Sequence, residues 1–90
     1  MIYRSKIGEI DLSKVVRLYP AGIVNVNGEI AEMSLEWCEM NDDKVDITHY
    51  VLVFDFTAPK EEVRDKKELE FSTKEELILT MTEVAQFFQD

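Results

Sequence analysis

The end of the chain constrains its fold most, because a short extended segment runs directly into an amphipathic helix. Residues 68–71 alternate like a strand, and a helical pattern follows from about Thr73 to Gln89. Ser72 with Glu75 fits a capping box, in which two amide hydrogens at a helix start are satisfied reciprocally. The apolar side chains that share one side of this helix are Leu77, Ile78, Met81, Val84, Ala85 and Phe88. We expect a helix over about residues 73–89 that packs on a sheet.

The residues before this helix have the composition of β-strands. Asn27 and Gly28 form a hairpin-turn signal, because both residues tolerate positive φ. Residues 29–40 alternate apolar and polar side chains, which predicts one half-buried antiparallel strand. Residues 57–66 are a charged loop with room for a helical turn at residues 60–64. The predicted strands cover residues 1–7, 9–12, 15–19, 22–26, 29–40, 45–56 and 67–71.

The strongest predicted strand, residues 45–56, is expected at the centre of the sheet. Its two faces are both apolar, with Tyr50, Leu52, Phe54 and Phe56 on one and Val51 and Val53 on the other. A strand that is apolar on both faces is covered on both faces. Pro20 interrupts an earlier apolar run, so its site is restricted to a strand edge, a strand end or a bulge.

Length and composition indicate one globular domain over residues 1–90. The chain is 46% hydrophobic, and its longest unbroken apolar run, residues 50–54, is far shorter than the ~20 residues that span a bilayer. The N-terminus lacks the pattern of a signal peptide, so a cytoplasmic protein is expected. Cys38 is the single cysteine, which fits a reducing compartment and gives no metal-ligand spacing.

The net charge of −9 is unevenly distributed. Residues 1–20 carry four basic and two acidic side chains, whereas the remainder carries six basic and 17 acidic ones. Such a surface repels nucleic acid and anionic lipid over most of its area, so neither is an expected partner. Arg4, Lys6, Lys14 and Arg17 offer the only basic patch through which a lipid surface could still be bound, and the charge of the rest of the chain opposes such binding.

The sequence contains no recognisable catalytic constellation. His49 is the only histidine, and alternation predicts it on the face opposite Tyr50, with Asp55 left open as a neighbour. Nearby carboxylates disfavour a reactive thiolate at Cys38. The acidic turn around Asp42 lacks the alternating ligands and glycine of a calcium loop. No glycine-rich phosphate loop or nucleophile elbow is present. We therefore expect a non-enzymatic protein without cofactor or metal.

Two segments resemble the pleckstrin-homology-like fold. Residues 9–19 look like the strand–turn–strand entry of small bacterial members, and residues 69–77 are similar to their last strand running into the capping helix. The resemblance covers nearly the whole chain and rests on alternation patterns. It implies an α+β fold in which an antiparallel sheet curves into a partly open barrel, capped by one C-terminal helix.

The chain departs from the lipid-binding relatives at two points. Those relatives carry a basic motif across the first two strands, which Lys6, Lys14 and Arg17 match only loosely. They also tend to place a tryptophan in the helix, whereas Trp37 lies in a predicted strand here. Phosphoinositide binding therefore does not follow from the resemblance.

Two surfaces are candidates for binding a protein partner or a second copy of the chain. One is the acidic segment from residue 29 to residue 46; its ordinary alternative is a solvated strand face. The other is the outer side of the helix, where Leu79 and Phe87 lie off the packing stripe, unless Phe87 simply folds over the rim. The predicted contact residues are Glu29, Glu32, Glu36, Asp42, Asp43, Leu79 and Phe87. We expect a protein-binding domain or, alternatively, a small acidic inhibitor or immunity-type protein that neutralises a basic partner.

Overall fold

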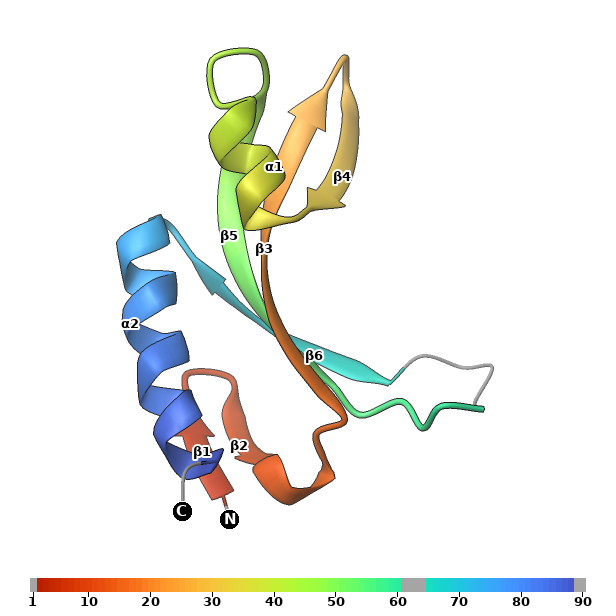
Figure 1. Cartoon of the computed structure of the whole chain (residues 1–90), viewed down its shortest axis with the longest axis vertical. Helices are drawn as coiled ribbons and strands as arrows, with labels where there is room; N and C mark the ends of the chain where they lie inside the picture. The colour runs from red at the N-terminus through yellow and green to blue at the C-terminus, as the bar shows by residue number, and fades with distance from the viewer. Residues whose placement is uncertain (1, 61–64, 89–90) are drawn as a thin grey trace.

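The computed structural model describes residues 2–60 and 65–88 and shows an α+β fold with two antiparallel sheets (Figure 1). The predicted helical turn at residues 60–64 falls mostly outside the described residues. A two-stranded hairpin, β1 (Ile2–Ser5) and β2 (Gly8–Asp11), opens the chain, and the short 3-10 helix η1 (Leu12–Lys14) follows. Gly8 pairs with Ser5 next to the turn of this hairpin, and its φ of +117° is a conformation that favours glycine.

The larger sheet has four antiparallel strands in the order β4-β3-β5-β6. Their bounds are β3 (Arg17–Val26), β4 (Glu29–Met33), β5 (Asp46–Asp55) and β6 (Lys66–Phe71). The prediction that the strand around residue 50 is central is confirmed, since β5 pairs with β3 and β6. The β3–β4 turn has φ values of 53° at Asn27 and 87° at Gly28, which confirms the predicted hairpin. Strands β4 and β6 form the two edges, and the sheet is open rather than closed into a barrel.

Two predicted segments, residues 15–19 and 22–26, form one continuous strand through Pro20. Strand β4 pairs only with residues 22–26 of β3, so Pro20 lies in the half of β3 that pairs with β5 alone. The proline therefore sits where β3 is an edge strand, and its missing amide proton removes no bond to β4.

The prediction of one strand over residues 29–40 is wrong, because helix α1 (Leu35–Met40) follows β4. Ser34 caps this helix, and its hydroxyl accepts a hydrogen bond from the amide of Trp37 at 3.1 Å. Cys38 is buried on the inner side of α1, and a Cβ at residue 22 would collide with its Sγ atom. Gly22 thus allows the close approach of α1 to β3, which overrides the alternating pattern.

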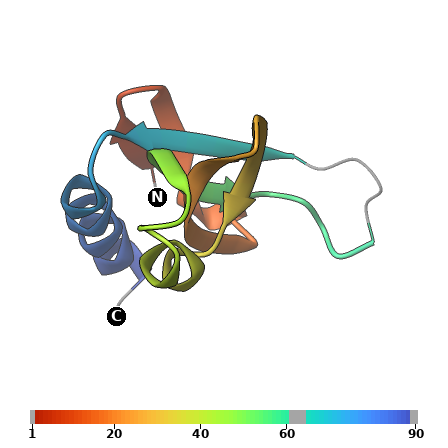
Figure 2. The same ribbon diagram turned by 90° about the horizontal axis from the view of Figure 1, so that it is seen from above.

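The main core lies on one face of the four-stranded sheet. The first helix, the second helix α2 (Lys74–Ala85) and the N-terminal hairpin all pack on this inner face, and Figure 2 shows both helices on the same side of β6. Leu69 and Phe71, the two apolar residues of the alternating segment 68–71, are buried in this core. The buried members of this core are Tyr3, Ile10, Leu12, Leu52, Phe54, Leu69, Phe71, Leu77 and Val84. Ala21, Val51 and Val53 form a smaller cluster on the opposite, outer face.

The cap of the C-terminal helix lies one residue later than predicted. The helix α2 is capped by Thr73, not Ser72, and Thr73 Oγ1 accepts a hydrogen bond from the Glu76 amide at 3.2 Å. Its packing stripe is narrower than expected, because Leu77 and Val84 are buried while Ile78 and Phe88 remain 40% and 47% exposed. The last turn is the 3-10 helix η2 (Gln86–Phe88). None of the described helices is long and apolar enough to span a membrane.

Candidate functional site

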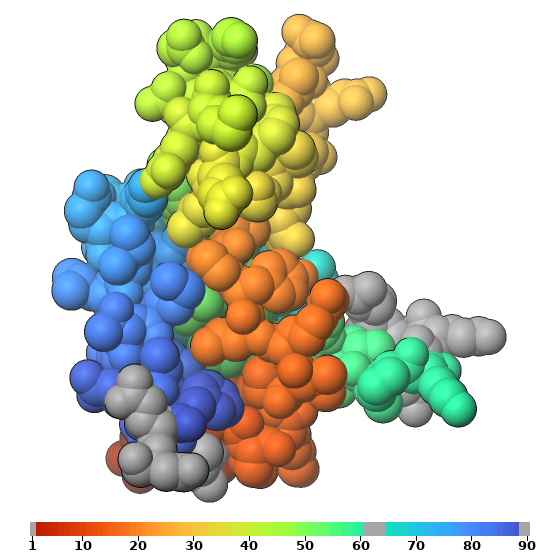
Figure 3. Space-filling model, in the orientation of Figure 1, coloured from red at the N-terminus to blue at the C-terminus, as the bar shows by residue number. Residues whose placement is uncertain are grey.

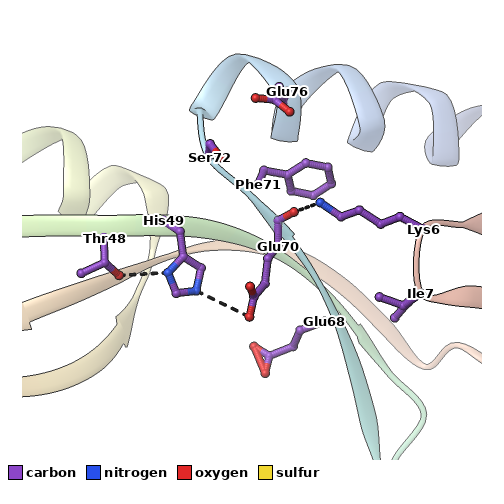
Figure 4. Close-up of a pocket in the computed structure, with 9 residues that line it drawn as sticks. All are labelled: Lys6, Ile7, Thr48, His49, Glu68, Glu70, Phe71, Ser72 and Glu76. Atoms are coloured by element: carbon purple, nitrogen blue, oxygen red, sulfur yellow. Dashed lines mark hydrogen bonds and ion pairs between the residues drawn. The ribbon is translucent and has the colours of Figure 1, made fainter.

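A cleft of about 560 Å³ lies at the end of β6, where three parts of the chain meet (Figure 4). The turn of the N-terminal hairpin forms one wall, β5 and β6 form the floor, and the start of α2 forms the other wall. Its size falls within the range of about 300–1,000 Å³ that is common for ligand sites. We call it the β6 cleft. Its lining residues are Lys6, Ile7, Thr48, His49, Glu68, Glu70, Phe71, Ser72 and Glu76.

A β-bulge in β5 shapes the floor of the β6 cleft. Ile23 pairs with His49 and Val24 pairs with Ile47, so Thr48 is an extra residue in β5. The Thr48 hydroxyl donates a hydrogen bond to the Ile23 carbonyl at 3.0 Å and lies 3.0 Å from His49 Nδ1. The Nε2 atom on the other side of the His49 ring faces Glu70.

Glu70 is the nearest acidic partner of His49. The distance between His49 Nε2 and Glu70 Oε1 is 3.9 Å, and the Glu70 side chain is 74% exposed. The possibility that His49 lies beside Asp55 is wrong. Asp55 instead sits at the far end of β5, where it accepts a hydrogen bond from Arg17 Nη2 at 2.9 Å.

Lys6 closes the cleft from the side of the N-terminal hairpin. Its ammonium group donates a hydrogen bond to the Glu70 carbonyl and lies 4.3 Å from the centre of the Phe71 ring. The first contact satisfies an acceptor on the open edge of β6, and the second is a cation–π interaction. The positive charge of Lys6 is thus held against the wall of the cleft.

Carboxylates dominate the chemistry of the β6 cleft. Glu68 and Glu70 extend from the same side of β6, and Glu76 comes from the first turn of α2 (Figure 4). Glu76 Oε1 is also the acceptor for the Thr73 hydroxyl at 3.2 Å. Hydrogen-bond acceptors and negative charge suit a positively charged organic group. Among the described residues, no group of three histidine, cysteine or acidic side chains is arranged to hold a metal ion.

The predicted acidic contact residues gather at the opposite end of the molecule from the N-terminal hairpin. Glu29 and Glu32 lie on β4, Glu36 lies on α1, and Asp42 and Asp43 lie in the turn that follows. All five side chains are exposed. This acidic end, residues 29–46, forms the top of the molecule in Figures 1 and 3.

Two apolar side chains are exposed within the acidic end. Met40, at the end of α1, is 77% exposed, and Ile30, on β4, is 64% exposed. Glu39 forms an ion pair with Lys74 of α2, which connects the acidic end to the C-terminal helix. The surface therefore combines negative charge with apolar contact area.

The two predicted apolar contact residues of the C-terminal helix have different surroundings. Leu79 is 71% exposed, whereas Phe87 is 40% exposed and makes an edge-to-face contact with Tyr3, with ring centres 6.0 Å apart. Phe87 therefore also packs the N-terminal hairpin. The structure does not bring these two residues together with the acidic end, and their binding role stays a prediction.

Two members of the predicted basic patch have partners within the chain. The Arg17 guanidinium binds Asp55, whose side chain is only 3% exposed, and lies 5.4 Å from the Tyr19 ring centre. Lys6 is held at the β6 cleft. These contacts reduce the positive charge that the patch could present to a membrane surface.

Cys38 has the surroundings of a structural residue. Burial raises the pKa of its thiol above the ordinary value, and a hydrogen bond with the Gly22 backbone partly opposes this shift. The thiol therefore stays protonated at neutral pH, which disfavours nucleophilic chemistry. The physical cause is burial between α1 and β3 rather than the neighbouring carboxylates.

No family model, curated protein or solved structure matched the chain.

The sequence did not predict the β6 cleft. Lys6 and Glu70 are separated by 64 positions, and no local pattern shows that the hairpin turn lies beside β6. The available signal was the pair Glu68 and Glu70, which alternate with the buried residues of β6. That pattern placed both carboxylates on one side of a strand, but it did not show what lies next to them.

Proposed function

We propose that this protein is a non-enzymatic binding domain that engages a positively charged protein partner through its acidic end. The observation that supports the proposal is the gathering of seven acidic side chains and a single lysine, all between residues 29 and 46, at one end of the fold. These residues come from β4, from α1, from the turn that follows and from the first residue of β5, so the charge is concentrated by the fold and not only by the sequence.

The acidic end has the composition of an interface that attracts its partner electrostatically. Like charges on one surface raise the association rate of an oppositely charged partner, and the effect falls as salt is added. The exposed side chains of Met40 and Ile30 supply apolar contacts that persist in salt. We expect the charges to set the rate of encounter and these two side chains to set the lifetime of the complex.

A second candidate function is inhibition of a basic enzyme, as in small immunity-type proteins. The exposed carboxylates of β4, α1 and the turn after α1 support it, because they could occupy a site that normally takes phosphates. An inhibitor of this kind depends mainly on charge, so its affinity falls steeply between low and high salt. A partner held mainly by Met40 and Ile30 depends on salt far less.

A relation to the pleckstrin-homology-like fold is part of the same proposal. Its support is the last strand running into a C-terminal helix that packs on an antiparallel sheet. Helix α1 between β4 and β5 and the open sheet are departures from the expected partly open barrel. A cytoplasmic location is proposed on the single, buried cysteine.

The test is a tagged capture of partners from the lysate of the source cell, washed at low and at high salt, followed by titration of the identified partner. The variant Asp42→Asn/Asp43→Asn removes two charges at the acidic end. The matched control Glu9→Gln/Glu83→Gln removes two exposed charges elsewhere. We expect weaker binding only for the first variant. Equal affinity of both variants would contradict a role for the acidic end.

A further inference from the structure

We propose that the open edge of β4 docks an extended, basic segment of the partner, which adds to the sheet as a further strand. This inference rests on the proposed function, because it names how the acidic end holds a positively charged protein. The observation that carries it is a sheet edge, in the described part of the chain, whose backbone groups are unpaired. Strand addition gives affinity through main-chain hydrogen bonds and specificity through alternate side chains.

Among the described residues, the four-stranded sheet has three unpaired stretches of edge, and two of them are obstructed. In the first half of β3, Pro20 lacks the amide proton that an added strand would need. On β6, Lys6 donates a hydrogen bond to the Glu70 carbonyl and so occupies an acceptor of that edge. No described strand or helix lies beside β4 on the side away from β3 (Figure 1). The edge of β4 is therefore the most accessible of the three.

The register of the β3–β4 hairpin shows which residues of β4 face the open edge. Its two-residue turn makes Val26 and Glu29 a hydrogen-bonded pair, and such pairs alternate with non-bonded pairs along an antiparallel ladder. Ile30 and Glu32 belong to the non-bonded pairs, so the amide proton and the carbonyl oxygen of each point away from β3. Among the described residues, neither a strand nor a side chain satisfies these groups. An added strand can pair with both residues without disturbing the existing sheet.

The side chains beside this edge indicate the composition of the added strand. Ile30 and Glu32 project from the outer face of the sheet, and both are exposed. The residues of an added strand that pair with them project from the same face, at a Cβ separation of about 5 Å. A basic residue opposite Glu32 forms a charge pair, and the aliphatic stem of a basic residue opposite Ile30 packs on its side chain. The partner segment thus carries basic residues at alternate positions.

The charge of the acidic end decides against a second copy of the chain as the occupant. Pairing of two β4 edges would bring together two surfaces that each carry seven acidic side chains and one lysine. Like charges in contact destabilise strand pairing, whereas a basic segment is attracted from a distance before its main chain pairs. The charges that protect the edge from self-association therefore admit a basic partner.

The experiment titrates the full chain, at low salt, with a capped eight-residue peptide of alternating lysine and valine, followed by calorimetry. Two N-methylated forms separate backbone pairing from charge attraction. N-methylation of the lysines blocks the amides that face β4, whereas N-methylation of the valines blocks the amides on the other side of the peptide. The two forms have the same charge and the same number of methyl groups. We expect the lysine-methylated form to bind about tenfold more weakly, because main-chain hydrogen bonds to Ile30 and Glu32 are lost, and the valine-methylated form to bind like the unmodified peptide.

Amide hydrogen exchange measured by NMR locates the pairing on the unaltered chain. We expect the amides of Ile30 and Glu32 to exchange more slowly in the complex, because the peptide carbonyls accept their protons. The amide of Ala31, which already faces β3, is the internal control. The variants Ile30→Pro and Ile30→Ala both lose the side chain, but only the first loses the amide proton. Ile30→Pro is therefore expected to bind the peptide about three- to tenfold more weakly than Ile30→Ala.

Three results would overturn the docking of a basic strand on β4. One is equal binding of the two N-methylated peptides. Another is unchanged exchange at Ile30 and Glu32 in the saturated complex, or no binding of the unmodified peptide. The third is dimerisation of the chain with both amides protected in the absence of peptide, which would assign the edge to a second copy. The capture of a protein partner and its response to Asp42→Asn/Asp43→Asn are measured separately, so the acidic end can still bind a partner if strand addition fails.

Discussion

The two ends of the long strands β3 and β5 differ in how they are held together. At the end covered by α2, a cluster of nine buried residues unites the N-terminal hairpin, η1, the sheet and the helix. At the acidic end, the six-residue α1 packs on β3, and the buried side chains there are Val24 and Cys38. The first end has the buried apolar area that stabilises a fold, and the second has the exposed charge that suits recognition.

The largest expected effect is a difference between the two ends in how much a truncated side chain lowers the unfolding free energy. Leu77→Ala removes a fully buried side chain between α2 and the sheet and is expected to cost about 2–5 kcal/mol. Leu35→Ala changes a partly buried side chain of α1 and is expected to cost less. Denaturant unfolding followed by circular dichroism compares the two variants. A larger loss for Leu35→Ala would reverse the comparison.

The second prediction concerns the contact that fixes α1. Gly22→Ala places a Cβ against Cys38 Sγ and is expected to destabilise the fold by about 1–3 kcal/mol. Cys38→Ala removes that sulfur, so the double variant should lose less than the sum of the single variants. A double-mutant cycle of unfolding free energies measures the difference. Simple additivity would mean that Gly22 is not the point of contact.

The third prediction tests which residue caps α2. Thr73→Ala removes the acceptor for the Glu76 amide and is expected to cost about 1 kcal/mol. Ser72→Ala is the matched control, and it should change the unfolding free energy by less than about 0.5 kcal/mol. A larger loss at Ser72 would restore the cap that the sequence predicts.

The fourth prediction uses alkaline pH. Burial, followed by the charges of Cys38, Glu75 and Asp42, raises the pKa of Tyr50 above its ordinary value. A raised pKa in the folded state means that the stability from this group is present below about pH 10 and is lost as pH rises further. Tyr50→Phe should therefore flatten the decline of unfolding free energy above that pH. An unchanged decline would show that other groups cause it.

The smallest expected effect is at the exposed side of α2. Leu79→Glu should change the unfolding free energy by less than about 0.5 kcal/mol, because the side chain is 71% exposed. Phe87→Glu should cost more, since the ring packs on Tyr3. If Leu79→Glu also abolishes self-association or partner capture while stability stays unchanged, the predicted role of this residue in binding is confirmed.

Patterns that repeat over many residues predicted the fold correctly where packing followed them. The two faces of β5 and the buried positions Leu77 and Val84 were predicted because their periods persist and the sheet buries them as expected. The segment 29–40 was mistaken for one strand because its alternation continues past Ser34. The cap at Ser34 and the space above Gly22 decided the local structure instead.

The candidate sites were less accessible to sequence reasoning than the fold. The acidic end could be anticipated, since its carboxylates lie close together in the chain. The β6 cleft could not, because it depends on how the hairpin turn docks beside a strand 64 positions away. Charge along a sequence is visible directly, whereas a concave surface arises only from tertiary packing.

Pro20 has a consequence for how copies of the chain behave at high concentration. Among the described residues, the first half of β3 has β5 on one side and no strand on the other, so it resembles an edge to which another molecule could add a strand. A strand that added there would find no amide proton at Pro20, and one rung of the intermolecular ladder would be missing. Pro20 thus disfavours the addition of further strands at this open edge of β3, and so disfavours fibril growth there.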